Sequence, residues 1–136
     1  MVVMGDHGMS REGDHGGGTQ DEVAAALYIS SKQKLTPAEL DLAEFFASPE
    51  LRDRSTYSQA DSRPVTVLPQ VDLVPTLALL LGLPIPFSNL GKVIPEALVM
   101  GLLGAGADKP EALWQVVQAL RHNAVQVNHY LEQYNA

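Results

Sequence analysis

Near its start the chain carries two Asp-His-Gly triplets eight residues apart, Asp6-His7-Gly8 and Asp14-His15-Gly16, and the apolar run Met1–Met4 leads directly into the first. Carboxylate and imidazole groups are ligands for divalent metal ions, and glycine allows the backbone to bend sharply between them. We therefore predict a buried strand that ends at Asp6 and His7, followed by a loop that returns His15 to the same place. In open α/β sheets, ligands bind at the edge where the strands end.

The same residues also suit an ordinary turn, because Asp caps its own backbone and Gly supplies a positive φ. A single Asp-His-Gly triplet is more often such a turn than a metal site. Two copies directly after an apolar strand favour a metal site, with Asp6, His7 and His15 as the candidate ligands. The motif alone does not specify a reaction.

Composition argues against several classes of protein. The 136 residues suit one small domain, and their formal net charge of -7 argues against nucleic-acid binding and leaves no basic patch for anionic lipids. Cysteine is absent, so the sequence offers neither a disulfide framework nor a cysteine-type zinc site. The most apolar segment, 73–87, is short and interrupted by prolines, so we expect no segment of this chain to span a membrane.

A second apolar run, Val23–Ile29, is bounded by polar residues. It is typical of a strand covered on both faces in a parallel or mixed sheet, although its alanines also suit a helix. Both apolar runs need sheet neighbours that the sequence scarcely offers, so we expect a fragment whose preceding part supplies them. Asp21 and Glu22 either orient a ligand histidine or are solvated loop charges, and the second interpretation is favoured.

Residues 30–64 are mostly polar and are predicted to form an insertion or a mobile surface loop, with 48–63 as its most mobile part. Within them, Thr36-Pro37-Ala38-Glu39 has the pattern of a capped helix start. The apolar stripe of this short helix is expected to consist of Leu40, Ala43 and Phe46 or Ala47. Val65–Leu68 is expected to form a short edge strand.

The segment 72–82 has the pattern of a core helix that packs on a sheet. Asp72 is the expected N-cap and Gly82 the expected C-cap. The apolar face of this helix is expected to consist of Leu73, Leu77, Leu80 and Leu81. Pro95–Leu103 is expected to form another short helix.

A long C-terminal helix is predicted over 108–135, where Asp108, Pro110 and Glu111 give a capping pattern. Apolar residues recur along one seam at spacings of four and three: Leu113, Val117, Leu120, Ala124, Val127, Leu131 and Tyr134. This heptad seam packs either on its own domain, which is favoured, or on a second copy in a coiled coil. His122 and His129 flank the seam and are expected to be solvated or to face a partner, with a second metal pair as the alternative.

Three stretches, taken in order, resemble the GPI ethanolamine phosphate transferases, which are enzymes of the alkaline-phosphatase superfamily. They are Gly5–Ser10, then Gly13–Gly17 with Glu22 and the apolar run that follows, and Pro69–Pro86. The Asp-His-Gly and Asp-Leu-x-Pro-Thr-Leu motifs are widespread in the superfamily, whereas the ending Gly-Leu-Pro-Ile-Pro is more particular to these transferases. Residues 13–17, Gly-Asp-His-Gly-Gly, resemble the type that acts on the third mannose (transferase 3), because the type that modifies the second mannose tends to have Ser in place of Asp14.

The resemblance implies roles for individual residues. Asp6 and His7 would bind one of two divalent metal ions, zinc in this family, and His15 would bind the other, whereas Asp14 matches a position that is not a ligand. The nucleophilic Thr of the family, two Asp residues and a further His have no counterpart in this sequence, so no catalytic residue is assigned. We therefore expect the C-terminal part of a catalytic domain, with an incomplete metal site and no activity on its own.

The resemblance also implies a fold and a reaction. Residues 1–136 would form part of an alkaline-phosphatase-like α/β/α sandwich, an α/β fold that here ends in the long helix. The implied reaction moves ethanolamine phosphate from phosphatidylethanolamine to a mannose of the GPI-anchor precursor, at the lumenal face of the endoplasmic-reticulum membrane. Full-length members are membrane-embedded, and a small stabilising membrane subunit is a further candidate partner. The alternatives are another phosphodiesterase or sulfatase of the superfamily, or a truncated binding module without catalytic activity.

Overall fold

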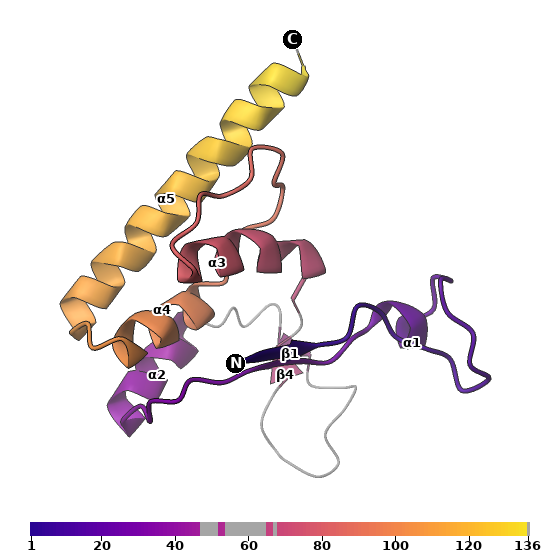
Figure 1. Cartoon of the computed structure of the whole chain (residues 1–136), viewed down its shortest axis with the longest axis horizontal. Coiled ribbons are helices and arrows are strands. Elements are labelled where there is room, and N and C mark those ends of the chain that lie inside the picture. The colour runs from indigo at the N-terminus through magenta and orange to yellow at the C-terminus, as the bar shows by residue number, and fades with distance from the viewer. Residues whose placement is uncertain (47–51, 54–64, 67, 136) are drawn as a thin grey trace. The chain divides into compact units, whose positions relative to one another are not determined.

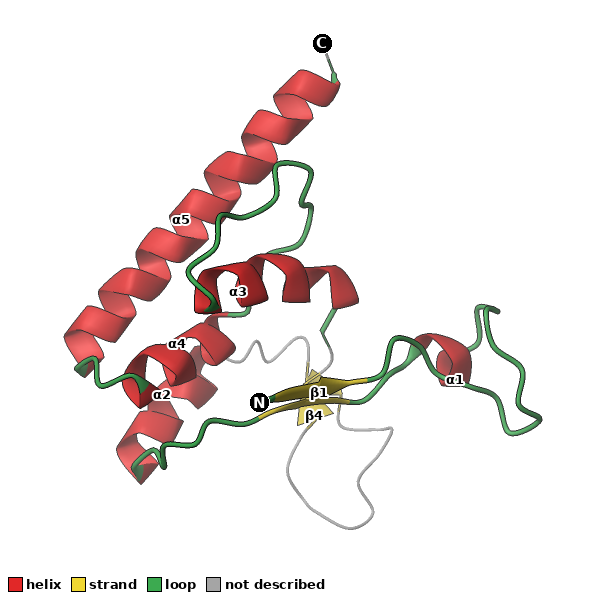
Figure 2. Cartoon of the chain, viewed as in Figure 1, coloured by secondary structure: helices red, strands yellow, loops and turns green. Residues whose placement is uncertain are grey.

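A computed structural model of the chain describes residues 1–46, 52–53, 65–66 and 68–135. Helices dominate, and the strands are short (Figures 1 and 2). The chain divides into two compact units, Met1–Lys32 and Gln33–Ala136, and each is described by itself. Residues 47–51 and 54–64 of the predicted insertion lie outside the described residues, as does nearly all of its predicted mobile part.

The first unit contains a small antiparallel sheet. Strand β1 (Val2–Met4) pairs with β2 (Leu27–Ile29), and a short helix, α1 (Gln20–Val23), precedes β2. The described part of the sheet is antiparallel, so it shows none of the parallel pairing that a parallel or mixed sheet would contain. The run that begins at Val23 is a strand only from Leu27 onward.

The first strand, which was predicted to be buried, is exposed in the described structure. Val3 in β1 is 55% exposed, and Tyr28 opposite it in β2 is 57% exposed. Two paired strands have no second layer of structure that could cover their faces, so their apolar side chains remain in contact with solvent in the described structure.

The second unit is built mainly from helices. In chain order these are α2 (Pro37–Phe46), the 3-10 helix η2 (Gln70–Asp72), α3 (Leu73–Leu80), α4 (Pro95–Gly104) and α5 (Lys109–Tyr134). Strand β3 (Arg52–Asp53) pairs with β4 (Val65–Thr66), which confirms a short strand at that place. Helix α4 packs against α2, α3 and α5 (Figure 1). Among the described helices, none is both long and apolar enough to cross a membrane.

The core of the second unit lies among α2, α4 and α5. Its buried apolar residues are Ala43, Val93, Leu98, Val99, Leu103, Ala112 and Val116. Ala43 and Phe46 confirm two residues of the predicted stripe on α2, because Ala43 is buried in the core and Phe46 packs against it. Leu40 is 46% exposed, and Leu42 packs against the core in its place.

Local signals correctly predict where several helices begin and end. At α2, the Glu39 carboxylate accepts hydrogen bonds from the backbone N–H and the hydroxyl of Thr36, each at 2.7 Å. The hydroxyl bond is the main cause of a lowered pKa of Glu39. At α5, Asp108 Oδ1 accepts from the Glu111 N–H at 2.9 Å. Gly82 follows α3 with a φ of 68°, which L side chains rarely adopt.

Asp72 occupies the N-cap position of α3, as predicted, but its side chain makes no capping hydrogen bond to this helix. It is only 2% exposed, and its Oδ1 accepts the backbone N–H of Lys92 at 2.9 Å. Thr76, one turn later and fully buried, accepts the N–H of Ile94 at 2.9 Å and donates its hydroxyl proton to the Asp72 carbonyl at 2.6 Å. This polar face of α3 is therefore turned inward. Leu81, which was predicted to be buried, is 71% exposed, and α3 packs on α4 rather than on a sheet.

The opposite side of the same backbone segment, Gly91–Ile94, is bound by α5. Asn123 is 3% exposed; its Oδ1 accepts the Val93 N–H at 2.9 Å, and its Nδ2 donates to the Gly91 carbonyl at 3.1 Å. Backbone groups of an extended chain alternate between its two sides. Side chains from α3 satisfy one side of this segment and the Asn123 amide satisfies the other, so helices take the place of neighbouring strands.

The long C-terminal helix is confirmed, and Leu120 of its predicted seam packs against the core, but other residues of the seam are exposed. Val116 is fully buried, whereas its neighbour Val117 in the predicted seam is 50% exposed. Tyr134, at the end of that seam, is 75% exposed. The inward face is fixed by Asn123, whose bonds to the segment Gly91–Ile94 turn α5 by about one position.

Candidate metal centre

The first Asp-His-Gly triplet lies where β1 ends. The Gly5 N–H donates to the Ala26 carbonyl at 3.0 Å, and the Gly8 N–H donates to the Glu22 carbonyl at 2.8 Å. A Cβ at Gly8 would overlap the backbone oxygen of Asp21, so only glycine fits at this place. Asp6 and His7 thus occupy a loop that is attached to α1 and to the strand that follows it.

A tight loop returns the chain to this place. The Ser10 N–H donates to the Asp14 carbonyl at 2.9 Å, and the Gly13 N–H donates to the Ser10 carbonyl at 3.1 Å. Gly13 has a φ of 89°, a conformation that glycine adopts readily. The result is that the rings of His7 and His15 stack, with centroids 5.3 Å apart and an angle of 11° between their planes.

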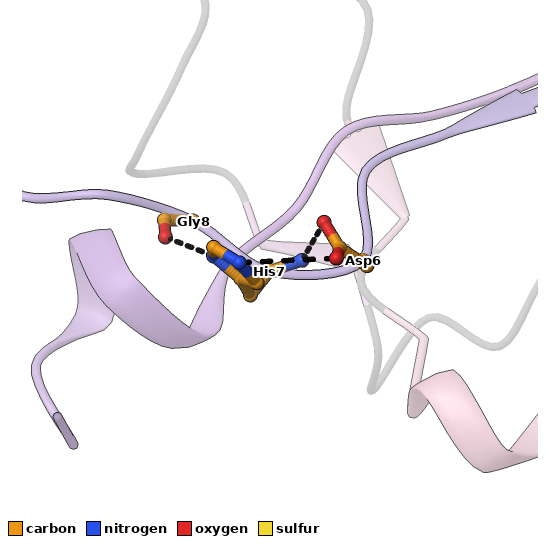
Figure 3. A network of polar contacts seen from close by, with 3 residues as sticks. All are labelled: Asp6, His7 and Gly8. Carbon is orange, nitrogen blue, oxygen red and sulfur yellow. Dashed lines mark hydrogen bonds and ion pairs between the residues drawn. The ribbon is translucent and has the colours of Figure 1, made fainter. Parts of the chain in front are cut away.

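The hydrogen bond at His7 fixes which ring nitrogen carries a proton. Nδ1 lies 2.7 Å from the Gly8 carbonyl (Figure 3), and a carbonyl can only accept, so Nδ1 is the donor. In the neutral ring this leaves the lone pair on Nε2, which lies 3.8 Å from Oδ2 of Asp6. The other carboxylate oxygen of Asp6 accepts the His7 backbone N–H at 3.1 Å.

These donors fit a divalent metal ion in type and pairing. A carboxylate with imidazole nitrogens is a zinc-type donor set, and a backbone carbonyl on the second ring nitrogen is the usual arrangement for a metal-bound histidine. Two ligands of one tetrahedral zinc ion lie about 3.4 Å apart, close to the separation of the two donor atoms of Asp6 and His7. The two stacked rings are parallel and do not converge on one point, as expected if His7 and His15 serve neighbouring ions.

The described residues supply only part of a metal site. Among them, no group of three or more His, Asp or Glu side chains is placed to hold one ion. The second candidate pair does not form such a group among these residues either. His122 is exposed on α5, whereas His129 lies 4.0 Å from the Glu132 carboxylate and meets the ring of Phe87 at 5.8 Å. The assignment of Asp6, His7 and His15 as ligands stays a prediction.

Glu22 does not orient a ligand histidine. Its carboxylate accepts the backbone N–H groups of Gly17 and Thr19, each at 3.1 Å, and the Thr19 hydroxyl at 2.5 Å. The bonds from Thr19 lower the pKa of Glu22. The carboxylate therefore caps α1 and holds the glycine loop to it, an arrangement that the spacing of Thr19 and Glu22 could have indicated.

The chain has clear relatives among curated proteins. The catalytic subunit of GPI ethanolamine phosphate transferase 3 from Mus musculus is 44% identical over 140 residues and covers 100% of this chain. The protein of the same name from Homo sapiens is 41% identical over 138 residues, again covering 100% of the chain. The chain is homologous to a segment of the GPI ethanolamine phosphate transferases.

The similarity extends to a second type of these transferases. GPI ethanolamine phosphate transferase 2 from Aspergillus fumigatus is 41% identical over 103 residues, which cover 74% of this chain. The chain spans about a tenth of the length of the two mammalian transferases, since it covers 10% of each. No protein-family model matches it, and no solved structure does.

Proposed function

We propose that this chain is part of an enzyme that transfers ethanolamine phosphate to a GPI-anchor precursor. The observation that carries the proposal is the 44% identity to transferase 3 over the whole chain. Relatives named transferase 2 also match, so the choice of the acceptor sugar depends on the sequence motif. We assign the third mannose from Asp14, which stands within Gly-Asp-His-Gly-Gly.

In this proposal, Asp6 and His7 hold one metal ion and His15 holds the other, with zinc as the candidate metal. Two such ions would stabilise the attacking and leaving oxygens of an in-line phosphoryl displacement. The contribution of this chain is to arrange its own donors. The Gly8 carbonyl keeps the proton on Nδ1 of His7, which leaves the lone pair on Nε2, the ring nitrogen that lies 3.8 Å from the Asp6 carboxylate. The Ser10–Asp14 loop sets His15 against His7.

The remaining parts of the site would come from outside this sequence. We propose that they include the nucleophilic Thr, further Asp and His ligands, and strands that pair with β1 and β2 in an alkaline-phosphatase-like α/β/α sandwich. The high exposure of Val3 and Tyr28 supports such a sandwich, because these apolar side chains need a covering layer. The proposed donor is phosphatidylethanolamine, at the lumenal face of the endoplasmic-reticulum membrane.

Transfer, rather than hydrolysis by another alkaline-phosphatase-type enzyme, is favoured because the mammalian and fungal relatives are all named transferases. A test uses a chimera in which this chain replaces the matching segment of the mouse protein. In cells that lack the mouse protein, we expect the chimera to restore ethanolamine phosphate transfer to the GPI precursor. The matched control is the same chimera with His7→Asn, which should be expressed but inactive. A chimera that is stably expressed yet fails to transfer would refute the proposal.

Metal binding can be tested separately with cobalt, whose visible absorption reports bound nitrogen and oxygen ligands. We expect Asp6→Asn, His7→Asn and His15→Asn each to weaken cobalt binding by the isolated chain. His122→Asn is the matched control, because that histidine is exposed on α5, and it should bind cobalt as the wild type does. Equal binding by all four variants would exclude the assigned ligands.

A further inference from the structure

An exposed apolar loop follows α3 in the second unit. We name Leu81–Leu90 the apolar loop. Four of its large side chains are at least half exposed: Leu81 at 71%, Leu83 at 55%, Phe87 at 50% and Leu90 at 60%. Single exposed apolar residues are ordinary on protein surfaces, whereas four within ten residues of chain make this loop a candidate contact surface. Such a surface needs an explanation other than packing within the described structure.

Charge is absent from this part of the chain. Residues 73–91 contain no Asp, Glu, Lys, Arg or His, and the acidic residue before them, Asp72, is buried at 2% exposure. The first charged residue after them is the exposed Lys92. A protein interface normally has a polar rim around its apolar centre, and the exposed side chains of the apolar loop offer little from which to build one.

Several backbone groups of the apolar loop form hydrogen bonds with other parts of the protein. Gln126 on α5 donates from its Nε2 to the carbonyls of Phe87 at 2.7 Å and Asn89 at 2.9 Å. The N–H of Leu83 donates to the Ala78 carbonyl at 2.8 Å, and that of Asn89 donates to the Pro86 carbonyl at 3.1 Å. Entry into lipid is costly for backbone groups that have only water as partners, and these backbone groups of the loop have protein partners instead.

Proline and aromatic side chains also make the apolar loop suitable for contact with lipid. Pro84 and Pro86 have no N–H group that would need a partner. The ring of Phe87 meets the ring of Tyr130 edge to face, with centroids 5.5 Å apart, so α5 supports the loop at its aromatic residue. Tyrosine combines an apolar ring with a polar hydroxyl, which suits the boundary between lipid and water.

From these observations we propose that the apolar loop docks on a zwitterionic lipid surface, into which Leu81, Leu83, Phe87 and Leu90 insert at headgroup depth. The formal net charge of -7 and the lack of cations within the loop favour zwitterionic over anionic headgroups. Lys92 at the end of the segment can reach a lipid phosphate with its flexible chain. The inference rests on the exposure of this loop and not on the proposed reaction, so either can fail without the other.

The first test places a fluorescent reporter in the loop. The full chain with Phe87→Trp and Trp114→Phe carries its single tryptophan within the apolar loop, whereas the wild type carries it only at Trp114. Gln126, which holds Phe87, lies twelve residues along α5 from Trp114, or about 18 Å. With phosphatidylcholine vesicles that contain brominated lipid, the reporter at position 87 should be quenched and Trp114 should not. Absence of quenching at position 87, with helix content unchanged by circular dichroism, would overturn the proposal.

The second test measures vesicle flotation of the full chain. Leu83→Asn and Leu90→Asn should each weaken binding about fivefold, since each withdraws roughly half of a leucine surface from lipid. The matched control is Val125→Asn on α5, where the side chain is 60% exposed but distant in sequence from the loop, and its binding should equal that of the wild type. Equal loss in all three variants would contradict a loop-specific contact. So would a dimer in light scattering that disappears with Leu90→Asn, because the loop would then bind a second copy.

Discussion

Thr76 offers a sharp test of how the second unit is held together. Its side chain is fully buried in α3, and its hydroxyl both accepts the Ile94 N–H at 2.9 Å and donates to the Asp72 carbonyl at 2.6 Å. Thr76→Val keeps the shape of the side chain and removes both bonds. The Ile94 N–H then has no acceptor at that position, and water cannot readily reach it.

The expected loss of stability follows from these contacts. A buried hydrogen bond contributes about 1 kcal/mol net, and a buried donor left without a partner costs about 1–3 kcal/mol. We therefore expect Thr76→Val to lower the free energy of unfolding by about 2 kcal/mol. Thr76→Ser is the matched control, because it keeps the hydroxyl and loses one methyl group, at a cost of about 1 kcal/mol.

Urea unfolding of the full chain measures both variants, and amide hydrogen exchange locates the effect. Exchange at Ile94 should accelerate in the valine variant but not in the serine variant. The amide of Val93, which bonds to Asn123 instead, serves as the internal reference. The reasoning is refuted if Thr76→Val unfolds within about 0.5 kcal/mol of the wild type, or if Ile94 stays as protected as before.

Three further predictions follow from single positions. Val116→Ala should lower the free energy of unfolding by about 2 kcal/mol and Val117→Ala by less than about 0.5 kcal/mol in urea titrations, because only the first is buried. The pKa of Glu39 is lowered in the folded chain, so its helix cap stabilises the fold fully above the ordinary glutamate pKa. This stabilisation is lost as the pH falls through the lowered pKa. Melting temperatures of wild type and Glu39→Gln should therefore converge in acid, whereas a constant difference would contradict the cap. Gly8→Ala should abolish the nuclear Overhauser contact between the two stacked histidine rings, since its Cβ overlaps the Asp21 carbonyl oxygen; an unchanged contact would show that the loop tolerates a side chain.

Features that depend on a few adjacent residues could be predicted from the sequence. The start of α2 depends on Thr36 and Glu39, and the end of α3 depends on the positive φ of Gly82. Each interaction spans no more than a few residues, so the local amino-acid sequence is sufficient to predict where the helix begins or ends. The same holds for the tight turn between the two Asp-His-Gly triplets, whose glycines allow the chain to return.

Features that depend on distant partners could not be predicted in this way. Strands β1 and β2 are apolar enough to be buried, but the described chain places only one layer there, so Val3 and Tyr28 remain exposed. Asp72 had the right type and position for a helix cap. The competing donor is the N–H of Lys92, twenty residues later, and no local pattern could reveal it.

Helix α5 shows most clearly why the buried face of a helix could not be predicted from the sequence. A search for apolar periodicity treats every polar residue as a surface residue, and Asn123 therefore counts against the face on which it lies. Its burial is stable because both ends of its amide bond to the backbone at Gly91 and Val93, about thirty residues earlier. An exposed valine at position 117 costs little by comparison, whereas a buried amide without partners would cost about 1–3 kcal/mol. The helix therefore turns to satisfy its one buried amide and leaves part of its apolar seam in solvent.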